Sequence, residues 1–582
     1  MGTPTNDPAL LLTAWIQAGQ EALQAFNSAF DGGRPAPTPG SPANQAADPV
    51  QQIFEAATTA AKLQGDLYQN ITDYWTRYAA QPLSGSRTAD TASVNDRRFA
   101  SEAWSNDPRF DAVRRMFLAY SSLMEGSVEK AAVDEKTKGQ LRFGVRQFLD
   151  AISPSNFFAT NPEAIQLAIE SGGQSLVEGM ALYLQDVAKG RVSMTDEAAF
   201  SVGKDLAVTP GAVVYENALI QLIQYAPTTN EVFKRPLVII PPCVNKFYIL
   251  DLQPENSFIR HAIEQGHTVF VVSWRQITAD LGHLTWDDYL KEGVMRAIDI
   301  ACAISGTPRV NALGFCIGGT LLAAALAIMA TAGEEKVESL TLLTTLLDFT
   351  DAGELGLLVS EEAVAAREAS IGRGGILPGK EMAFTFSALR ANDLIWQYVT
   401  NGYLKGKAPP AFDLLYWNAD STNLPGPMVS WFLRNAYLEN RFSQAGKTIQ
   451  CGVPMDLATI EVPTYIYASR DDHIVPWKTA YQSRRLLGGD TTFVLGASGH
   501  IAGVINPPAK RKRNYWVNEG RIDDPDTWQA TARSVPGSWW PHWYEWLAGH
   551  AGDRIPAASK LGSKTYRTIE PAPGRYVQAR AD

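Results

Sequence analysis

The hydrophobic positions of the chain change their spacing near residue 206. Before this point, apolar side chains recur every three or four residues, which is the period of a helix with one buried face. Beyond it, short runs that are apolar at almost every position alternate with longer helical stretches. Near-continuous apolar strands separated by helices are typical of a parallel sheet covered on both faces. We therefore predict a helical N-terminal region followed by an α/β fold.

Eight strands are predicted in the α/β part. The first two, 212–217 and 219–223, are expected to pair as a hairpin. The other six are predicted at 237–240, 267–272, 309–313, 340–345, 464–468 and 491–495. In the helical part, the Ser-Pro-Ser-Asn sequence at 153–156 is predicted to end one helix, and Asn161 with Pro162 to begin another.

About 110 residues separate the sixth predicted strand from the seventh, which is too long for a loop in a compact domain. This insertion is rich in aromatic residues, among them Trp396, Trp417 and Trp431. We predict that it forms a cap that excludes water from a site beneath it. The predicted parts are a helical, partly flexible N-terminal segment (1–95), a helical domain (96–205), the first part of an α/β core (206–347), the inserted cap (348–462) and the second part of the core (463–582).

The N-terminal segment holds two helical patterns, around Trp15 and Trp75, joined by a linker rich in Pro, Gly and Ala at 31–49. Two helices with apolar faces on a loose tether can bind an apolar partner. They can equally well pack on their own domain, and the sequence leaves both interpretations open.

The predicted strand at 309–313 runs into the turn 314–318 (Gly-Phe-Cys-Ile-Gly), and an apolar helix follows. A strand, a Gly-x-Cys-x-Gly turn and a helix form the nucleophile elbow of α/β-hydrolases, with cysteine in place of serine. The glycines are needed because strand and helix backbones crowd a strained turn. The positive end of the helix is expected to lower the pKa of the thiol. We predict an α/β-hydrolase core with Cys316 as nucleophile; the alternative is a buried, inert cysteine.

An α/β-hydrolase orders its triad along the chain as nucleophile, acid and base. Here the loop after the seventh predicted strand holds Asp471 and Asp472, and the loop after the eighth holds His500. The histidine can take the thiol proton, while the carboxylate fixes the tautomer and stabilises the imidazolium. Spacing alone leaves the choice between the two aspartates open. His473, beside them, is expected to support the site or the fold and not to react.

Two backbone N–H groups are expected to stabilise the oxyanion. The first belongs to Ile317, the residue after the nucleophile, and the second comes from the loop after the third strand. In this chain that loop begins Pro-Pro-Cys-Val-Asn at 241–245, so Val244 or Asn245 is the predicted second donor. The side chain of Asn245 can also serve only to brace the turn.

Composition narrows the class of protein. The net charge of −10 argues against non-specific binding of nucleic acid. Four cysteines in 582 residues, with no Cys-x-x-Cys pair, give no sign of a disulfide framework or a zinc site. The sequence has no signal-peptide pattern and no apolar run of roughly 18 residues. We expect a cytoplasmic, soluble protein with no metal, no cofactor, no nucleic-acid partner and no membrane span.

Several motifs resemble those of one family, the poly(3-hydroxyalkanoate) synthases. The run 314–320 (Gly-Phe-Cys-Ile-Gly-Gly-Thr) is similar to the lipase-like box of these enzymes. Further stretches that are similar to family motifs, in the same order, lie at 153–157, 241–252, 416–425 and 499–508. The resemblance extends from about residue 95 to the last residue of the sequence.

The resemblance implies an acyltransferase that polymerises (R)-3-hydroxyacyl-coenzyme A and releases coenzyme A, with the polyester held as a thioester on Cys316. The family pattern assigns the acid to Asp472, directly before the histidine. Phe315 and Ile317 beside the cysteine resemble the single-subunit, short-chain (class I) enzymes. The resemblance also implies a homodimer that carries the growing polyester chain at a granule surface, with granule-associated proteins as further candidate partners.

A cysteine-elbow thioesterase or esterase is the alternative function. Hydrolases of that kind are usually much shorter and lack the long cap and the helical N-terminal domain. The basic run at 510–513 is expected either to meet the phosphates of coenzyme A or to form an ordinary solvated surface.

Overall fold

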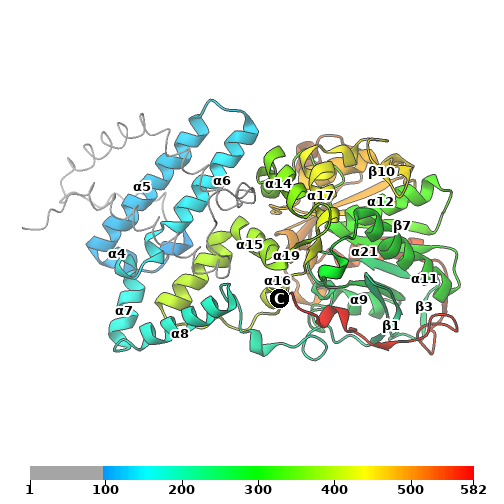
Figure 1. The fold of residues 1–582 in the computed structure, drawn as a ribbon, viewed down its shortest axis with the longest axis horizontal. Helices are drawn as coiled ribbons and strands as arrows, with labels where there is room; N and C mark the ends of the chain where they lie inside the picture. The colour runs from blue at the N-terminus through cyan, green and yellow to red at the C-terminus, as the bar shows by residue number, and fades with distance from the viewer. Residues whose placement is uncertain (1–95, 582) are drawn as a thin grey trace, which may run out of the picture. The chain divides into compact units, whose positions relative to one another are not determined.

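The computed structural model of the protein describes residues 96–581, which form two units (Figure 1). Of these residues, 96–196 and 385–411 belong to a helical unit, and 197–384 and 412–581 belong to an α/β unit. The predictions for residues 1–95 lie outside the described part of the chain. Within residues 96–581, none of the helices combines the length and apolar character that crossing a bilayer requires.

Four helices make up most of the helical unit. They are α5 (Pro108–Lys130), α6 (Glu135–Ala151), α7 (Pro162–Glu170) and α8 (Gln174–Lys189), preceded by the short α4 (Ala103–Asn106). Asp107, Asp134 and Asn161 cap α5, α6 and α7, because each side chain accepts a hydrogen bond from a backbone N–H of the first turn. The helix end expected at 153–156 and the start expected at Asn161 are confirmed.

The inserted segment is divided between the two units and is not the single cap expected for residues 348–462. In the helical unit, Ile395, Trp396 and Val399 form a small core with Ala151 of α6. Further contacts inside this unit are the hydrogen bonds Gln147 Nε2 to Ala388 O (2.7 Å) and Tyr403 Oη to Asp186 Oδ2 (2.8 Å) and the ion pair Lys405–Glu163 (2.6 Å). The apolar side chains in the middle of the insertion are covered inside the helical unit. This segment therefore belongs to that unit.

The α-helices of the insertion are short. They are α13 (Gly353–Leu357), α14 (Glu361–Ile371), α15 (Gly379–Leu389), α16 (Asp413–Asn418) and α17 (Gly426–Phe432). Helix α15 contains the point at which the chain passes from the α/β unit to the helical unit. The helical domain also ends at Asp196 and not at the expected residue 205.

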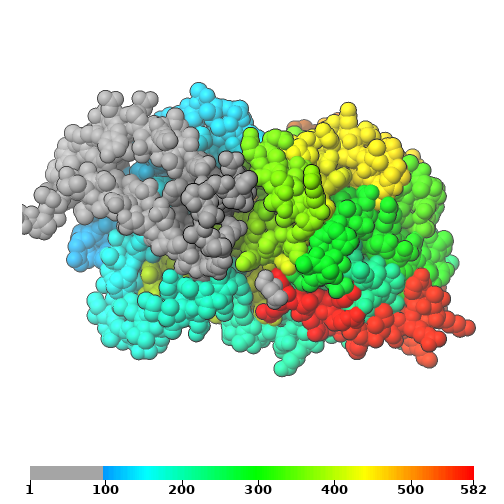
Figure 2. Space-filling model, in the orientation of Figure 1, coloured from blue at the N-terminus to red at the C-terminus, as the bar shows by residue number. Residues whose placement is uncertain are grey.

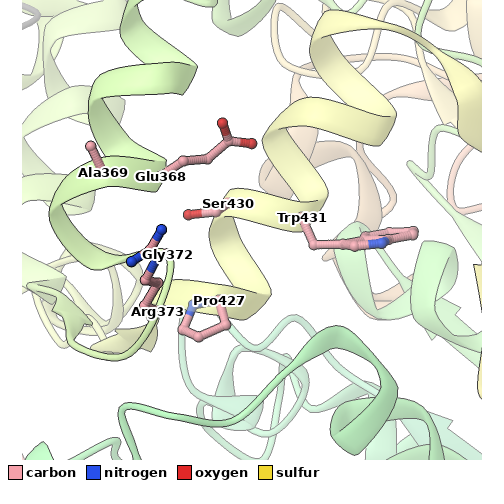
Figure 3. A pocket seen from close by; sticks show the side chains of 7 residues that line it. All are labelled: Glu368, Ala369, Gly372, Arg373, Pro427, Ser430 and Trp431. Atoms are coloured by element: carbon pink, nitrogen blue, oxygen red, sulfur yellow. The ribbon is translucent and has the colours of Figure 1, made fainter.

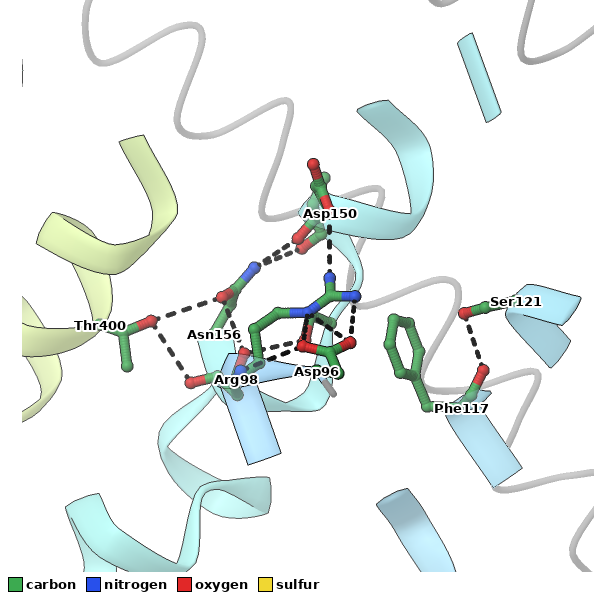
Figure 4. A network of polar contacts seen from close by, with 10 residues as sticks. Asp96, Arg98, Phe117, Ser121, Asp150, Asn156 and Thr400 are labelled. Atoms are coloured by element: carbon green, nitrogen blue, oxygen red, sulfur yellow. Dashed lines mark hydrogen bonds and ion pairs between the residues drawn. The ribbon is translucent and has the colours of Figure 1, made fainter. Parts of the chain in front are cut away.

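A polar network lies inside the helical unit (Figure 4). The guanidinium of Arg98 binds Asp96 at 2.7 Å and Asp150 at 3.1 Å. Asn156 Nδ2 donates to the backbone oxygen of Asp150 at 2.7 Å, and Thr400 Oγ1 donates to Asn156 Oδ1 at 3.4 Å. Burial raises the pKa of Asp150 to about 6, although the charge of Arg98 opposes this shift. The network joins the end of α6 to the middle of the insertion.

An eleven-stranded sheet forms the centre of the α/β unit, in the order β15-β14-β13-β12-β7-β6-β4-β5-β2-β1-β17. The strands are β1 (Gly211–Glu216), β2 (Ile220–Tyr225), β4 (Leu237–Ile240), β5 (Val269–Trp274), β6 (Val310–Phe315), β7 (Val337–Leu343), β12 (Thr464–Ser469), β13 (Thr491–Gly496), β14 (Asn514–Val517), β15 (Arg533–Pro536) and β17 (Glu570–Pro571). Strands β13 to β5 in this order are parallel, and antiparallel strands extend both edges. All eight predicted strands are present, including the β1–β2 hairpin.

Helices cover both faces of the sheet. Helices α11 (Arg296–Ser305) and α12 (Ile317–Thr331) pack on one face, and α9 (Phe258–Glu264) and α21 (Trp540–His550) pack on the other. The side chains of neighbouring residues in a strand pack into the hydrophobic cores on opposite faces of the sheet, as those of Val238 and Ile239 do in β4. Helix α12 is buried on all sides from Ile317 to Met329, as its uniformly apolar sequence predicts.

The tail of the described chain returns to the α/β unit. Strand β17 pairs with β1, and a short 3₁₀ turn (Tyr576–Gln578) follows. The guanidinium of Arg580 donates to the hydroxyl of Tyr416 in α16. In Figure 2 the last residues of the unit, in red, run along the visible face of the α/β unit.

Candidate active site

Cys316 occupies a strained turn between β6 and α12. Its backbone has φ 54° and ψ −130°, a conformation that costs a non-glycine residue free energy. The neighbouring glycines are required by close approach. A Cβ atom on Gly314 would lie 2.3 Å from Gly319 Cα, and one on Gly318 would lie 2.3 Å from Ile240 O. The turn can therefore form only with glycine at these two positions, as the sequence pattern predicts.

The end of β7 braces this turn. Cys316 N donates to Leu343 O at 2.9 Å. Thr345 Oγ1 donates to Leu343 O at 3.0 Å and to Cys316 O at 3.2 Å. The strained residue is thus held by backbone and side-chain hydrogen bonds from the adjacent strand, which keeps its sulfur in one place.

His500 begins α19 (His500–Val504), directly after β13, and Asp472 follows β12. His500 Nδ1 lies 2.7 Å from Asp472 Oδ2, and both side chains are buried. The other carboxylate oxygen, Asp472 Oδ1, accepts from the backbone N–H groups of Ile474 and Val475, each at 2.9 Å. The backbone N–H groups therefore fix the Asp472 side chain independently of its contact with the histidine.

Asp471 has different surroundings. Its side chain is 57 % exposed and pairs with Arg470 at 3.1 Å. Of the two aspartates, the contact with His500 is made by Asp472. Asp472 therefore meets the histidine, whereas the side chain of Asp471 faces solvent.

The electrostatics of His500 follow from its neighbours. Burial on its own would lower the pKa of the imidazole, but the charges of Asp472 and Cys316 and hydrogen bonds to both raise it to about 10. Phe315 stacks on the ring, with centroids 5.8 Å apart and planes at 26°. An imidazolium is thus favoured beside the Asp472 carboxylate and the Cys316 sulfur.

His473 is half-buried and takes part in a backbone contact. Its carbonyl accepts from Glu354 N at 3.1 Å, and a Cβ atom on Gly353 would lie 2.4 Å from the same oxygen. His473 therefore ties the loop of the acid to the start of the insertion.

The three predicted oxyanion donors lie on two neighbouring turns. The N–H of Ile317 is in the first turn of α12, where no helical carbonyl precedes it. On the loop after β4, the carbonyl oxygens of Cys243 and Val244 accept hydrogen bonds from Thr422, the first from Oγ1 at 2.7 Å and the second from N at 3.4 Å. In a trans peptide the N–H points opposite to the preceding C=O. The N–H groups of Val244 and Asn245 are therefore turned away from Thr422.

Tyr437, an aromatic residue of the insertion, lies close enough to Cys316 to be affected by its charge. Burial, and then the charge of Cys316, raise the pKa of Tyr437. Tyr437 contacts Phe349 and Phe432, with ring centroids 5.1 and 5.4 Å apart. The three rings form an aromatic cluster that includes this neighbour of Cys316. Sequence reasoning did not single them out, although the density of aromatic residues was the available signal.

A hollow of about 610 Å³ lies between α14 and α17 (Figure 3). Its lining comprises Glu368, Ala369, Gly372, Arg373, Pro427, Ser430 and Trp431. Ser430 points into it, whereas the ring of Trp431 points away and stacks on Trp286 with centroids 4.7 Å apart. The triad is not part of this lining, so the hollow is a feature of the insertion surface.

The basic run at 510–513 follows α19. Lys510, Arg511 and Lys512 are exposed, while Arg513 donates to the carbonyl of Ala502 in α19. The run is thereby attached to the helix that begins with His500.

The chain matches two family descriptions. "Poly-beta-hydroxybutyrate polymerase (PhaC) N-terminus" matches residues 95–262, and "alpha/beta hydrolase fold" matches residues 236–507. The second match confirms the predicted fold class.

Three curated relatives cover most of the chain. The poly(3-hydroxyalkanoate) polymerase subunit PhaC of Cupriavidus necator is 51% identical over 524 residues, which are 89% of this chain and 88% of the relative. The protein of the same name from Rhizobium meliloti is 43% identical over 527 residues, which are 89% and 85% of the two chains. The poly(3-hydroxyalkanoate) polymerase of Methylorubrum extorquens is 40% identical over 620 residues and covers 100% of both.

Proposed function

The chain belongs to the poly(3-hydroxyalkanoate) polymerase family, and from this premise we propose that it polymerises (R)-3-hydroxyacyl-coenzyme A through a thioester on Cys316. The observation that supports the mechanism is the buried 2.7 Å contact between His500 and Asp472 together with the coupling of His500 to Cys316. This arrangement supplies a nucleophile, a base and an orienting carboxylate in the order that acyl transfer needs.

In the first half-reaction the Cys316 thiolate attacks the thioester carbonyl, and the C–S bond to coenzyme A breaks. His500, which holds the thiol proton, returns a proton to the departing coenzyme A thiolate. The exchange replaces one thioester by another of similar energy, so the acyl group on the enzyme stays activated. The N–H of Ile317 and that of Val244 or Asn245 stabilise the oxyanion of each tetrahedral intermediate.

In the second half-reaction a hydroxyl group attacks the acyl-thioester carbonyl, forms an ester and releases the sulfur of Cys316. The hydroxyl belongs to a second monomer or to the stored acyl unit. His500 removes its proton, with Asp472 as the alternative base. Water has to be excluded at this stage, because hydrolysis would release the acid. The apolar side chains around Tyr437 support that exclusion.

The substrate range proposed is short-chain, as in 3-hydroxybutyryl-coenzyme A, and the type is class I. The support is Phe315 and Ile317 beside the nucleophile. Turnover of 3-hydroxybutyryl-coenzyme A should exceed that of a 3-hydroxydecanoyl substrate by at least an order of magnitude. Equal rates with the two substrates would contradict this part of the proposal.

The assembly proposed is a homodimer in the cytoplasm, attached to polyester granules and granule-associated proteins. If association favours an open insertion, specific activity rises with enzyme concentration and the lag phase shortens. Sedimentation and initial rates over one dilution series test this. Equal turnover by monomer and dimer with no lag would contradict it and leave the triad untouched.

A cysteine hydrolase is the second candidate function, because a triad with the same geometry also hydrolyses thioesters. One assay separates the two functions. Free thiol and insoluble polyester are measured together after addition of (R)-3-hydroxybutyryl-coenzyme A. Thiol with polyester supports the polymerase, and thiol with only monomeric acid supports the hydrolase.

A further inference from the structure

A second buried ion pair lies in the α/β unit. Lys246 Nζ is 2.7 Å from Asp420 Oδ1, and the two side chains are only 3% and 6% exposed. Each ion makes one further hydrogen bond: Lys246 Nζ donates to Ala579 O at 2.7 Å, and Asp420 Oδ2 accepts from Tyr248 Oη at 2.8 Å. The pair thus connects three separate parts of the chain: the loop after β4, the loop after α16 and the tail.

The partners of this pair hold the loop that carries Val244 and Asn245. Asn245 forms an isolated antiparallel bridge with Ser421, the residue after the buried aspartate. Trp417 Nε1 donates to Lys246 O at 2.7 Å. With the two bonds from Thr422 described above, the carbonyl side of the loop is occupied by one short segment, residues 417–422.

The opposite side of the loop touches the elbow. The missing Cβ of Gly318 leaves room for the carbonyl oxygens of Ile240 and Pro241, which would lie 2.3 and 2.6 Å from such an atom. Trp274 Nε1 donates to Pro241 O at 2.9 Å. A displacement of the loop would therefore change the distance between its own N–H groups and that of Ile317.

Hydrophobic packing alone would hold the loop at a lower desolvation cost. Burying two ions costs several kcal/mol of desolvation each, and an apolar pair of the same volume is often as stable or more stable. An ion pair also fixes the orientation of the residues that form it, because Lys246 has to reach both Asp420 and the carbonyl of Ala579. The hydrogen bonds around the ion pair orient the loop. They leave the N–H groups of Val244 and Asn245 unused by the fold.

We propose that Lys246 and Asp420, together with the carbonyl of Ala579, are positioning residues that set the N–H groups of Val244 and Asn245 against that of Ile317. The inference rests on the proposed function, because it assumes that this loop stabilises an oxyanion. It assigns a role to the motifs at 241–252 and 416–425, which the triad does not use, and to the tail.

The test compares Lys246→Met, Lys246→Arg and a chain that ends at Gln578 with the wild type, and uses Lys564→Met as a control because Lys564 is exposed. Two rates are measured: coenzyme A release from (R)-3-hydroxybutyryl-coenzyme A, and alkylation of Cys316 by iodoacetamide. Alkylation needs the thiolate and the histidine but no oxyanion donors.

Lys246→Met should lower kcat by about 10- to 100-fold with KM within twofold, since a donor that acts only in the transition state affects kcat. The rate of alkylation should stay within twofold of the wild-type rate. Lys246→Arg should recover part of kcat, and the chain ending at Gln578, which keeps the ion pair, should lose about 3- to 10-fold. The control should match the wild type in both assays.

Two results would overturn the inference: wild-type kcat in a folded Lys246→Met variant, or alkylation that falls as much as kcat. If Lys246→Met does not fold, the chain ending at Gln578 decides by the same two rates. Failure of the proposed function is distinguishable, because it would appear in the wild type itself as no coenzyme A release or as monomeric acid without polymer.

Discussion

The α/β unit contains two buried acid–base pairs that look alike in distance and burial. His500 Nδ1 and Asp472 Oδ2 are 2.7 Å apart, with side chains 7% and 0% exposed. Lys246 Nζ and Asp420 Oδ1 are also 2.7 Å apart, with side chains 3% and 6% exposed. The two pairs differ in what surrounds them. His500 has a third neighbour, Cys316, whose bonds can change, whereas the further partners of the lysine pair are a carbonyl and a phenol.

The difference shows that burial and a short contact do not identify a catalytic pair. In the first pair, the charges of Asp472 and Cys316 more than offset the effect of burial and raise the pKa of His500. In the second, burial outweighs the charge of Asp420 and lowers the pKa of Lys246. In the proposed mechanism a proton is exchanged in the first pair, because the sulfur of Cys316 adjoins it. In the second, every strong contact joins backbone segments, so its effect is on geometry.

The largest effect is expected on removal of the proposed nucleophile. Cys316→Ala should reduce coenzyme A release by a factor on the order of 10⁴ or more, because the remaining oxyanion donors and binding contacts give little catalysis alone. Cys316→Ser should retain little activity, since a hydroxyl is far less acidic than a thiol. Thiol release measured on folded, purified variants tests this, and near-wild-type turnover by Cys316→Ala would remove the basis for treating the two pairs differently.

The orienting carboxylate should come next. Asp472→Asn should lower kcat by a factor on the order of 10³ to 10⁴, as loss of the correct histidine tautomer does in other triads. Asp471→Asn, the matched control, should stay within about twofold because its side chain is exposed. The pKa of His500 should also fall in Asp472→Asn, because the charge of that carboxylate raises it; histidine NMR signals followed with pH measure this. Equal kinetic effects of the two variants would contradict the assignment.

The lysine pair should behave differently when both members are replaced. Lys246→Met alone should destabilise the protein by about 3–5 kcal/mol, because Asp420 is left buried and unpaired. The double variant Lys246→Met with Asp420→Leu should recover most of that stability and part of kcat. Apolar replacement of His500 and Asp472 should restore no activity. Urea unfolding with kinetics on the same samples gives the comparison, and strictly additive losses in the double variant would refute it.

The smallest expected effect concerns the ion pair of the helical unit, Arg98 with Asp150. Burial raises the pKa of Asp150 to about 6 from an ordinary value of 3.8. The contribution of this carboxyl to the stability of the folded state is therefore fully present at pH values below 3.8. Its contribution is lost as pH rises through about 6. Asp150→Asn should remove this pH dependence, worth at most about 3 kcal/mol. Thermal unfolding at pH 4.5 and pH 7 measures it, with Asp471→Asn as exposed control; the same pH dependence in both variants would contradict the assignment.

The elements and residues that depend on local pattern were predictable from the sequence. The eight strands follow from apolar runs, and the elbow from the glycines beside Cys316, because the crowding that demands glycine involves residues close in sequence. The family resemblance, stated from motifs, is confirmed by the relatives. The class and the chemical roles of the site residues remain proposals.

What could not be predicted depends on contacts between distant parts of the chain. The aromatic content of the insertion indicates burial, but not that Trp396 is covered by the helical unit while Tyr437 lies in the α/β unit. Asp471 and Asp472 are adjacent, so no periodicity separates them. Lys246 and Asp420 each look like ordinary surface residues in sequence, and only the fold brings them together. The edge strands β14, β15 and β17 are not apolar throughout, because they are only partly buried and contain polar residues.

The division of the insertion between the two units limits how recombination can exchange parts of such a protein. The chain passes from one unit to the other three times, after residues 196, 384 and 411. A recombination event with one breakpoint would transfer residues 96–196 and leave 385–411 behind, with Ile395 and Trp396 deprived of their cover. The helical unit therefore cannot be gained, lost or exchanged as a cassette. A substitution in one piece therefore acts on contacts that the other piece makes.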